Sequence, residues 1–218
     1  LDFNQIQHYL NRGYLGDYKT TDWEGDVAYA TDIVWTAAQT YSLNPKFILV
    51  LLQKEQSLVE DDDPTQNQLD WATGYAVCDS CSKDDPAIQR WKGFGKQVNS
   101  ASAQFREGYL ADIENVGSTQ GKYGPDIEVE IDGTTVTPSN AATAALYAYT
   151  PHLHGNENFV KIWDRWFSQQ YPSGSLLQGD GESGVYYIEF GYKRAIHSWS
   201  ALQSRFDADL IITVNPNI

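Results

Sequence analysis

Methionine is absent from this chain of 218 residues, and basic residues are few. Because the chain begins with Leu1 and has no methionine, we expect an excised or mature fragment whose N-terminal targeting segment is missing. Lys and Arg number 15 against 29 Asp and Glu, the formal net charge is −14, and no basic cluster occurs. Nucleic acids and anionic membrane surfaces attract basic patches, so the composition argues against both partners.

Long apolar runs are also lacking, and cysteine is scarce. No run reaches the roughly 18 apolar residues that a membrane-spanning helix needs, so we expect no membrane span. The two cysteines form Cys78-Asp79-Ser80-Cys81. Two thiolates do not complete a tetrahedral zinc site, and a redox motif would need a thioredoxin-like strand before it. We expect a local disulfide between Cys78 and Cys81 in an oxidising compartment, with free thiols as the alternative.

The longest acidic run is Glu60-Asp61-Asp62-Asp63. Such a run could hold a hard cation such as Ca²⁺. It lacks the glycine and the distal glutamate of an EF-hand loop, so a solvated loop is the favoured interpretation. We therefore predict neither a metal site nor a cofactor.

Aromatic residues, in contrast, are abundant at 13% of the chain, with 14 Tyr and 7 Trp. Carbohydrate sites often use aromatic faces because the C–H faces of sugar rings are apolar. Most of these side chains are expected to fill the core. The composition is therefore compatible with a carbohydrate partner without demanding one.

Glu55 is the most informative single residue. Asn44 followed by Pro45 is typical of a helix start, with a capping residue and then proline at the first helical position. From there Ile48, Leu52, Glu55 and Val59 fall on one face at spacings of four, three and four. A carboxylate on an apolar stripe loses water, and a protonated carboxylic acid is what a general acid needs. The alternative is that Glu55 reaches solvent past the helix end or pairs with a base.

The first 170 residues are expected to be mostly helical. Apolar residues recur at helical spacing in five further segments, and residues 60–93 show no clear period. The segments are residues 3–10, 27–41, 94–109, 142–149 and 159–167. Residues 127–131 alternate with period two, meet Asp132-Gly133 and return through residues 134–137, which predicts a β-hairpin set among the helices.

A change in composition and in hydrophobic periodicity near residue 171 predicts a domain boundary. Gly and Ser become frequent after Tyr171, and period-two patterns predict a hairpin over residues 185–196 and a strand over residues 210–214. We expect an α+β protein with a mainly helical domain over residues 1–170, followed by a small β-rich module over residues 171–218. So short a module is marginal alone.

The order of these segments resembles the lysozyme-like lytic transglycosylase superfamily. Residues 50–57, Val-Leu-Leu-Gln-Lys-Glu-Gln-Ser, look like that family's catalytic helix with its Glu. Residues 145–151, Ala-Leu-Tyr-Ala-Tyr-Thr-Pro, are similar to its Ala-Tyr-Asn-Ala-Gly-Pro segment, with Ala148 and Thr150 where the family has Asn and Gly. Residues 71–77 stand where the family has Gly-Leu-Met-Gln, and only Gly74 matches. The tail resembles short repeats of bacterial envelope proteins.

The resemblance implies a lysozyme-like helical domain that acts on peptidoglycan glycan strands in a bacterial cell envelope or outside the cell. Glu55 would be the catalytic acid and then base, and Tyr147 would orient it or bind the sugar. The residues that would contact the glycan are Gln56, Gly74, Tyr75, Tyr147 and Tyr149.

Three activities fit this resemblance. A lytic transglycosylase cleaves the β-1,4 bond with a single Glu, because the muramic acid 6-hydroxyl attacks within the same sugar. A muramidase or glucosaminidase would need a second carboxylate, for which Asp70 and Asp79 are candidates, or a positioned water. A non-catalytic glycan-binding or scaffolding module would bind without cutting. We favour cleavage with Glu55 alone.

Overall fold

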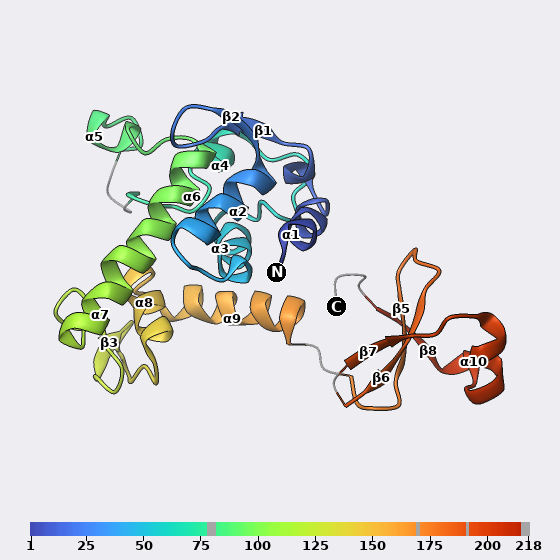
Figure 1. The fold of residues 1–218 in the computed structure, drawn as a ribbon. Helices are drawn as coiled ribbons and strands as arrows, with labels where there is room; N and C mark the ends of the chain where they lie inside the picture. Colours follow the sequence, from blue (N-terminus) through green and yellow to red (C-terminus); the bar gives the residue numbers. More distant parts are fainter. Residues whose placement is uncertain (78–81, 169–170, 191, 215–218) are drawn as a thin grey trace. The chain divides into compact units, whose positions relative to one another are not determined.

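The computed structural model describes residues 1–77, 82–168, 171–190 and 192–214, and the chain divides into two compact units, Leu1–Ile162 and Trp163–Ile218. Helices dominate the first unit, which also holds two small antiparallel sheets, and a four-stranded sheet dominates the second. The predicted α+β class is confirmed (Figure 1). No helix among the described residues has the length and apolar character needed to cross a bilayer.

Four helices form the first half of unit 1, with α2 in contact with the other three. They are α1 (Phe3–Leu10), α2 (Ala30–Thr40), α3 (Pro45–Gln56) and α6 (Phe94–Ala103). The predicted start of α3 is confirmed, since the Asn44 side chain accepts a hydrogen bond from the Lys46 amide and Pro45 opens the helix. Both residues suit these positions, because the cap satisfies an amide that the helix leaves unpaired and proline lacks one.

The segment between α1 and α2 contains structure that the sequence pattern missed. A single 3₁₀ turn, η1 (Tyr14–Gly16), precedes an antiparallel pair, β1 (Lys19–Thr21) and β2 (Val27–Tyr29). Val27 was predicted on a helical face but lies in β2 and is 72% exposed. The strands are three residues long, which is too short for a period-two pattern to stand out.

The stretch over residues 60–93 was predicted to be irregular, and it contains two short helices, α4 (Gln66–Asp70) and α5 (Pro86–Gln89). Thr65 and Gln68 form a capping box at the start of α4. The acidic run lies in the loop before α4, where three of its four residues are exposed. The expected disulfide between Cys78 and Cys81 lies outside the described residues.

The second half of unit 1 begins where α6 continues into a π-helical segment, η2 (Gln104–Leu110), and then α7 (Ala111–Val116). The predicted hairpin is confirmed as β3 (Val129–Ile131) and β4 (Thr134–Val136), with positive φ at Asp132 and Gly133 as the turn requires. Two helices follow, α8 (Ala141–Tyr149) and α9 (Leu153–Phe167), and Thr150 and Pro151 lie between them.

Unit 2 is a sheet with strand order β7-β6-β5-β8. Its elements are β5 (Leu176–Gly179), β6 (Val185–Glu189), β7 (Tyr192–Ala195), α10 (Trp199–Arg205), the 3₁₀ turn η3 (Ala208–Leu210) and β8 (Ile211–Val214). The predicted hairpin and final strand are present, whereas β5 was missed. Leu176, Val185 and Leu202 form its buried cluster. The boundary predicted near residue 171 lies later in the chain than the observed division, which follows Ile162 and falls inside α9.

We expect a chain ending at Gln170 to stay soluble and to unfold in one cooperative transition. It retains every element of unit 1 and the whole of α9, and the clusters around Leu51 and Ile113 lie entirely within it. Thermal unfolding followed by circular dichroism, with the full chain as the reference, checks this. Aggregation or a broad transition would show that residues 171–218 are needed to complete the fold.

Candidate functional site

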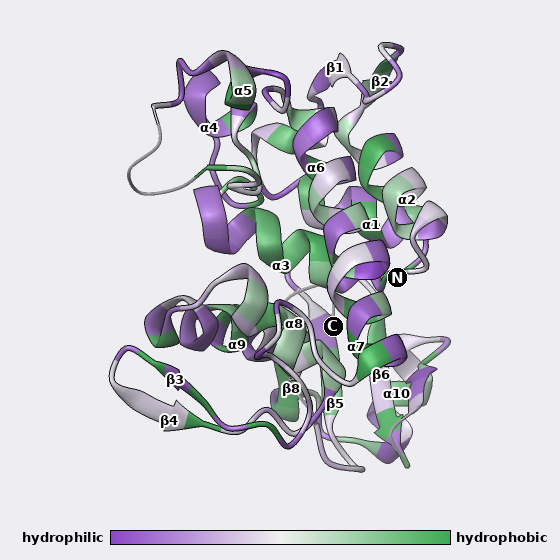
Figure 2. Ribbon diagram, turned by 90° about the vertical axis from the view of Figure 1, so that its left-hand side faces the viewer, coloured by the Kyte–Doolittle hydropathy of each residue, from purple (hydrophilic) through white to green (hydrophobic). Residues whose placement is uncertain are grey.

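Glu55 lies in the last turn of α3, where the helix changes from apolar to polar. The helix buries Ile48 and Leu52, and its ribbon turns from hydrophobic to hydrophilic residues in the final turn (Figure 2). Ser57 ends the helix in the left-handed conformation, with φ of 60°. The Glu55 side chain keeps 22% of its surface exposed, so solvent or a ligand reaches the carboxylate.

Lys54 gives Glu55 a charged partner. The Lys54 Nζ lies 2.6 Å from Glu55 Oε1, and only 6% of the lysine side chain is exposed. The same ammonium donates to Thr150 Oγ1 at 2.8 Å, and the Thr150 carbonyl accepts from Asn156 Nδ2 at 2.7 Å. The predicted stripe of Ile48, Leu52 and Val59 is buried. Glu55 therefore pairs with a base, which was the stated alternative to a carboxylate kept protonated on an apolar stripe.

Gly74 lies against the other oxygen of Glu55. A Cβ atom built on Gly74 would approach Oε2 to 3.3 Å, and the residue has φ of +69°, a conformation that favours glycine. The backbone of residue 74 can therefore sit beside the carboxylate with no side chain between them. The structure thus brings together two of the predicted site residues.

Gln97, which the sequence analysis did not single out, holds the loop that carries Gly74. Its side chain is fully buried on α6. Its Oε1 accepts from the amides of Thr73 at 3.4 Å and Tyr75 at 3.0 Å, and its Nε2 donates to the carbonyls of Tyr75 and Trp91. A signal was available, because Gln97 falls on the same helical face as Phe94 and Ala101 at spacings of three and four.

Tyr149 occupies the place beside Glu55 that was expected for Tyr147. The Tyr149 hydroxyl donates to the Thr73 carbonyl at 2.8 Å. Burial, and secondarily the negative charge of Glu55, raise the pKa of Tyr149 well above 10. Tyr147 packs instead against the cluster around Ile113. Two residues along a helix are about 200° apart around its axis, so the two tyrosines face different ways.

Further tyrosines extend this cluster. Tyr75 packs edge-to-face on Trp91 with ring centroids 5.3 Å apart, and Tyr109 packs in the same way on Phe105 at 5.7 Å. Burial raises the pKa of Tyr109, and the proximity of Tyr75 adds to this. Tyr109 lies in the π-helical segment η2, a kind of helix that is frequent at functional sites.

The remaining predicted residues are less closely tied to Glu55. The Gln56 backbone carbonyl accepts from Gln68 Nε2 at 3.0 Å, which ties the end of α3 to α4. The Asp70 carboxylate lies 3.3 Å from Lys92 Nζ and accepts from Gln66 Nε2 at 3.0 Å. Its carboxylate is thus engaged with residues other than Glu55. Asp79 lies outside the described residues.

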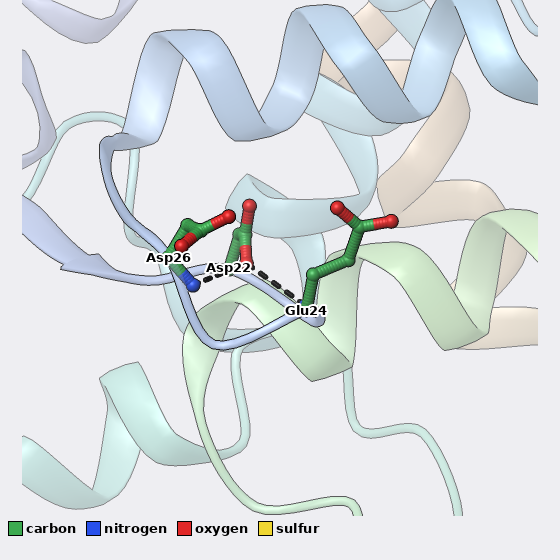
Figure 3. Close-up of side chains that lie close together, drawn as sticks. All are labelled: Asp22, Glu24 and Asp26. Atoms are coloured by element: carbon green, nitrogen blue, oxygen red, sulfur yellow. Dashed lines mark hydrogen bonds between the residues drawn. The ribbon is translucent and has the colours of Figure 1, made fainter.

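A separate group of carboxylates lies in the turn between β1 and β2. The ligand atoms of Asp22, Glu24 and Asp26 lie within 4.8 Å of one another (Figure 3). Asp22 Oδ1 accepts hydrogen bonds from the amides of Glu24, Gly25 and Asp26 at 2.8 to 3.0 Å. These hydrogen bonds explain why Asp22 stands at the start of the turn, and no bound ion is needed for that role. An aspartate there accepts hydrogen bonds from turn amides that have no partner in a neighbouring strand.

Replacement of Gln97 by leucine should destabilise the protein by about 2–4 kcal/mol. The change leaves two amides and one carbonyl of the Gly74 loop, and the Trp91 carbonyl, without their partner. Urea unfolding measures the effect. The control is Gln66→Leu, which removes an exposed amide and should change the free energy of unfolding by less than about 0.5 kcal/mol. Equal effects of the two changes would contradict the role given to Gln97.

Replacement of Tyr149 by phenylalanine should cost about 1 kcal/mol at pH 7, because the Thr73 carbonyl loses its donor. The raised pKa of Tyr149 means that the unfolded chain loses this proton first as pH rises. The parent protein should therefore lose stability from about pH 10 upward. Tyr149→Phe should lose less over that range.

The control for this prediction is Tyr147→Phe on the same helix, and urea unfolding at pH 7, 9.5 and 10.5 compares the three proteins. We expect the control to keep the alkaline loss of the parent. The prediction fails if Tyr149→Phe and the parent show the same dependence of unfolding free energy on pH.

Comparison with family models gives a match to the family described as LasA, N-terminal domain, over residues 3–178. No curated protein and no solved structure matches the chain. The matched region contains Glu55, Gly74, Gln97 and Tyr149. The description names a domain and not an activity. Because the match covers well over half of the 218 residues, the chain belongs to the LasA N-terminal domain family.

Proposed function

We propose that this protein cleaves the β-1,4-glycosidic bond of peptidoglycan glycan strands, with Glu55 as its only acid and base. The observation that carries the proposal is the setting of the Glu55 carboxylate. Lys54 holds Oε1, and the backbone of Gly74 lies beside Oε2 with no side chain between them. The resemblance of this helix and of the tyrosine segment to lytic transglycosylases supports the same assignment, as does the partial exposure of Glu55.

The chemistry follows from what a glycosidic bond requires. The leaving oxygen must receive a proton as the bond breaks, and the cationic sugar must then be captured. Protonated Glu55 would supply the proton at Oε2 and, as the resulting carboxylate, would remove a proton from the attacking hydroxyl. For a lytic transglycosylase that hydroxyl is the 6-hydroxyl of the same muramic acid. A catalytic group must come within about 2.6–3.2 Å of the proton's new position, which the partial exposure of the Glu55 side chain permits.

The surroundings of Glu55 support a scheme with one carboxylate. Asp70, the candidate for a second carboxylate within the described residues, is engaged by Lys92 and Gln66. Tyr149 would act through the backbone, because its hydroxyl holds the Thr73 carbonyl next to Gly74. Gln56, Tyr75 and Tyr147 remain candidates for contacts to the glycan. A hydrolase of this kind would instead need a positioned water to capture the sugar.

A non-catalytic glycan-binding or scaffolding module is the second candidate, and the ion pair favours it. A carboxylate engaged by an ammonium at 2.6 Å is a strong acceptor for sugar hydroxyls, as a glycan-binding site requires. The family description also suits a module that serves a neighbouring domain. Both candidates imply a location in the cell envelope or outside the cell.

We expect Glu55→Gln to slow the release of soluble fragments from purified peptidoglycan by about 10²-fold or more, because glutamine cannot donate the proton. The variant keeps the shape of the side chain but removes the charge that pairs with the nearly buried Lys54 ammonium, so its melting temperature should fall, and the rates are compared at a temperature where both proteins are folded. The control is Glu128→Gln, which removes an exposed carboxylate far along the sequence and should leave the rate unchanged.

Product analysis separates the candidates. A 1,6-anhydro end identifies a transglycosylase, and a reducing end identifies a hydrolase. If neither protein releases fragments but both sediment with insoluble wall, the binding module is correct and the proposed cleavage is wrong. Release by Glu55→Gln at the parent's rate would remove Glu55 from the chemistry.

A further inference from the structure

A pocket separate from the Glu55 site lies between the segment around η1 and the acidic loop that follows α3. Its volume is about 420 Å³, within the range of pockets that hold small ligands. The lining residues are Gly13, Tyr14, Asp17, Tyr18, Lys19 and Asp62. None of them belongs to the predicted glycan site, so the pocket is independent of the function proposed above.

The two walls of this pocket are fixed to each other by the backbone. The Tyr14 amide donates to the Asp61 carbonyl at 2.8 Å. A Cβ atom on Gly13 would meet the Asp61 carbonyl oxygen at 2.6 Å, so only glycine allows this approach. The Asp61 side chain accepts from the Asp63 amide at 3.0 Å and from Gln68 Nε2 at 3.1 Å. A pocket with walls held in this way is formed before any ligand arrives, which lowers the entropic cost of binding.

The carboxylates of the pocket are not used by the fold. The Asp61 carboxylate is occupied by its hydrogen bonds, whereas the exposed carboxylates of Asp17 and Asp62 have no hydrogen-bond or ion-pair partner among the residues that the structure describes. Lys19 also lines the pocket, but its Nζ lies over the Tyr29 ring at 4.3 Å from the centroid. Two carboxylates therefore line the pocket, and the Lys19 ammonium is directed at a neighbouring ring.

Two tyrosine rings complete the pocket. The Tyr14 and Tyr18 ring centroids lie 5.4 Å apart with an interplanar angle of 40°, and Tyr14 is 44% exposed. Tyr18 is anchored by an edge-to-face contact with buried Phe94 at 5.8 Å. Aromatic faces attract cations, and carboxylates accept hydrogen bonds from them. This pairing of groups suits an ammonium ion with an apolar stem.

We propose that this pocket binds a primary ammonium group on an aliphatic stem, such as the lysine side chain of a peptide. The stem lies against the rings of Tyr14 and Tyr18, and the ammonium donates to Asp17 and Asp62. A neutral sugar could hydrogen-bond the two carboxylates but would bring them no positive charge, and an anion would be repelled by them and by the net charge of −14.

The test is a titration of the full chain with Nα-acetyl-lysine methylamide, followed by NMR chemical shifts of backbone amides. We expect saturable shifts at residues 13–19 and 61–63. The norleucine analogue has the same stem without the charge and should bind at least about tenfold more weakly, because the cation–π and ionic contacts are lost. N-acetylglucosamine is the third ligand, and we expect no saturable shifts with it.

The paired variant is Asp17→Asn with Asp62→Asn, which should weaken lysine binding by about tenfold or more. The matched control is Asp26→Asn with Asp63→Asn, which removes two exposed carboxylates outside the pocket and should change binding by less than about twofold. Melting temperatures of both variants verify folding. Equal binding of norleucine, preferential binding of the sugar, or equal losses in the two variants would each overturn the proposal.

Discussion

The buried side-chain amide of Gln97 is the constraint on which the candidate site depends. An irregular loop has no ladder of its own, so its amides and carbonyls need partners from elsewhere when they are buried. Gln97 supplies both an acceptor and a donor to this loop from the rigid helix α6. Thr73 adds a hydroxyl hydrogen bond to the Gln97 carbonyl at 3.1 Å. Gly74 lies between the two residues that Gln97 holds, so the distance from the loop to Glu55 is set by α6 and not by the loop itself.

Glu55 is also held from the other side, and its two oxygens consequently differ. Lys54 fixes Oε1 and, through Thr150, joins the end of α3 to the junction between α8 and α9. Asn156 in turn caps the Thr150 carbonyl. One oxygen is therefore part of a structural network, whereas Oε2 faces a glycine backbone. If Oε1 fixes the position of the side chain, Oε2 is left to contact a ligand. That oxygen could accept a hydrogen bond from a bound sugar or donate a proton to the glycosidic oxygen. The placement of Glu55 therefore suits a binding module and an enzyme equally. The two differ in whether Glu55 donates a proton to the bound glycan.

The parts of this structure that the sequence predicted are those governed by local rules. The start of α3 follows from Asn44-Pro45, and the turn at Asp132-Gly133 follows from the positive φ that both residues tolerate. The missed parts depend on contacts between distant segments. No local pattern reveals that Lys54 reaches Thr150, which lies 96 residues away, or that the Tyr149 hydroxyl reaches the Thr73 carbonyl beside Gly74. Gln97 is the exception, because a polar residue on an otherwise apolar helical face is itself a sequence signal of a buried hydrogen-bond network.

The carboxylates of this acidic protein are of two kinds. Some accept hydrogen bonds that stabilise turns, and others make no such bond among the described residues. Asp22 accepts three backbone amides, and Asp132 accepts the Leu153 amide and contacts His152, interactions that hold the pKa of Asp132 below its usual value. These carboxylates have a structural role, since they accept hydrogen bonds from backbone amides that find no backbone partner in the turns. Asp17 and Asp62 satisfy no group of the described chain, yet they line a preformed pocket beside two tyrosines. Charge alone does not mark a site in so acidic a protein, so the proposal rests on the pocket and its two rings together with the unpaired carboxylates. This criterion sets the pocket lined by Tyr14 and Tyr18 apart from the Asp22 turn, where Asp22 accepts three backbone amides.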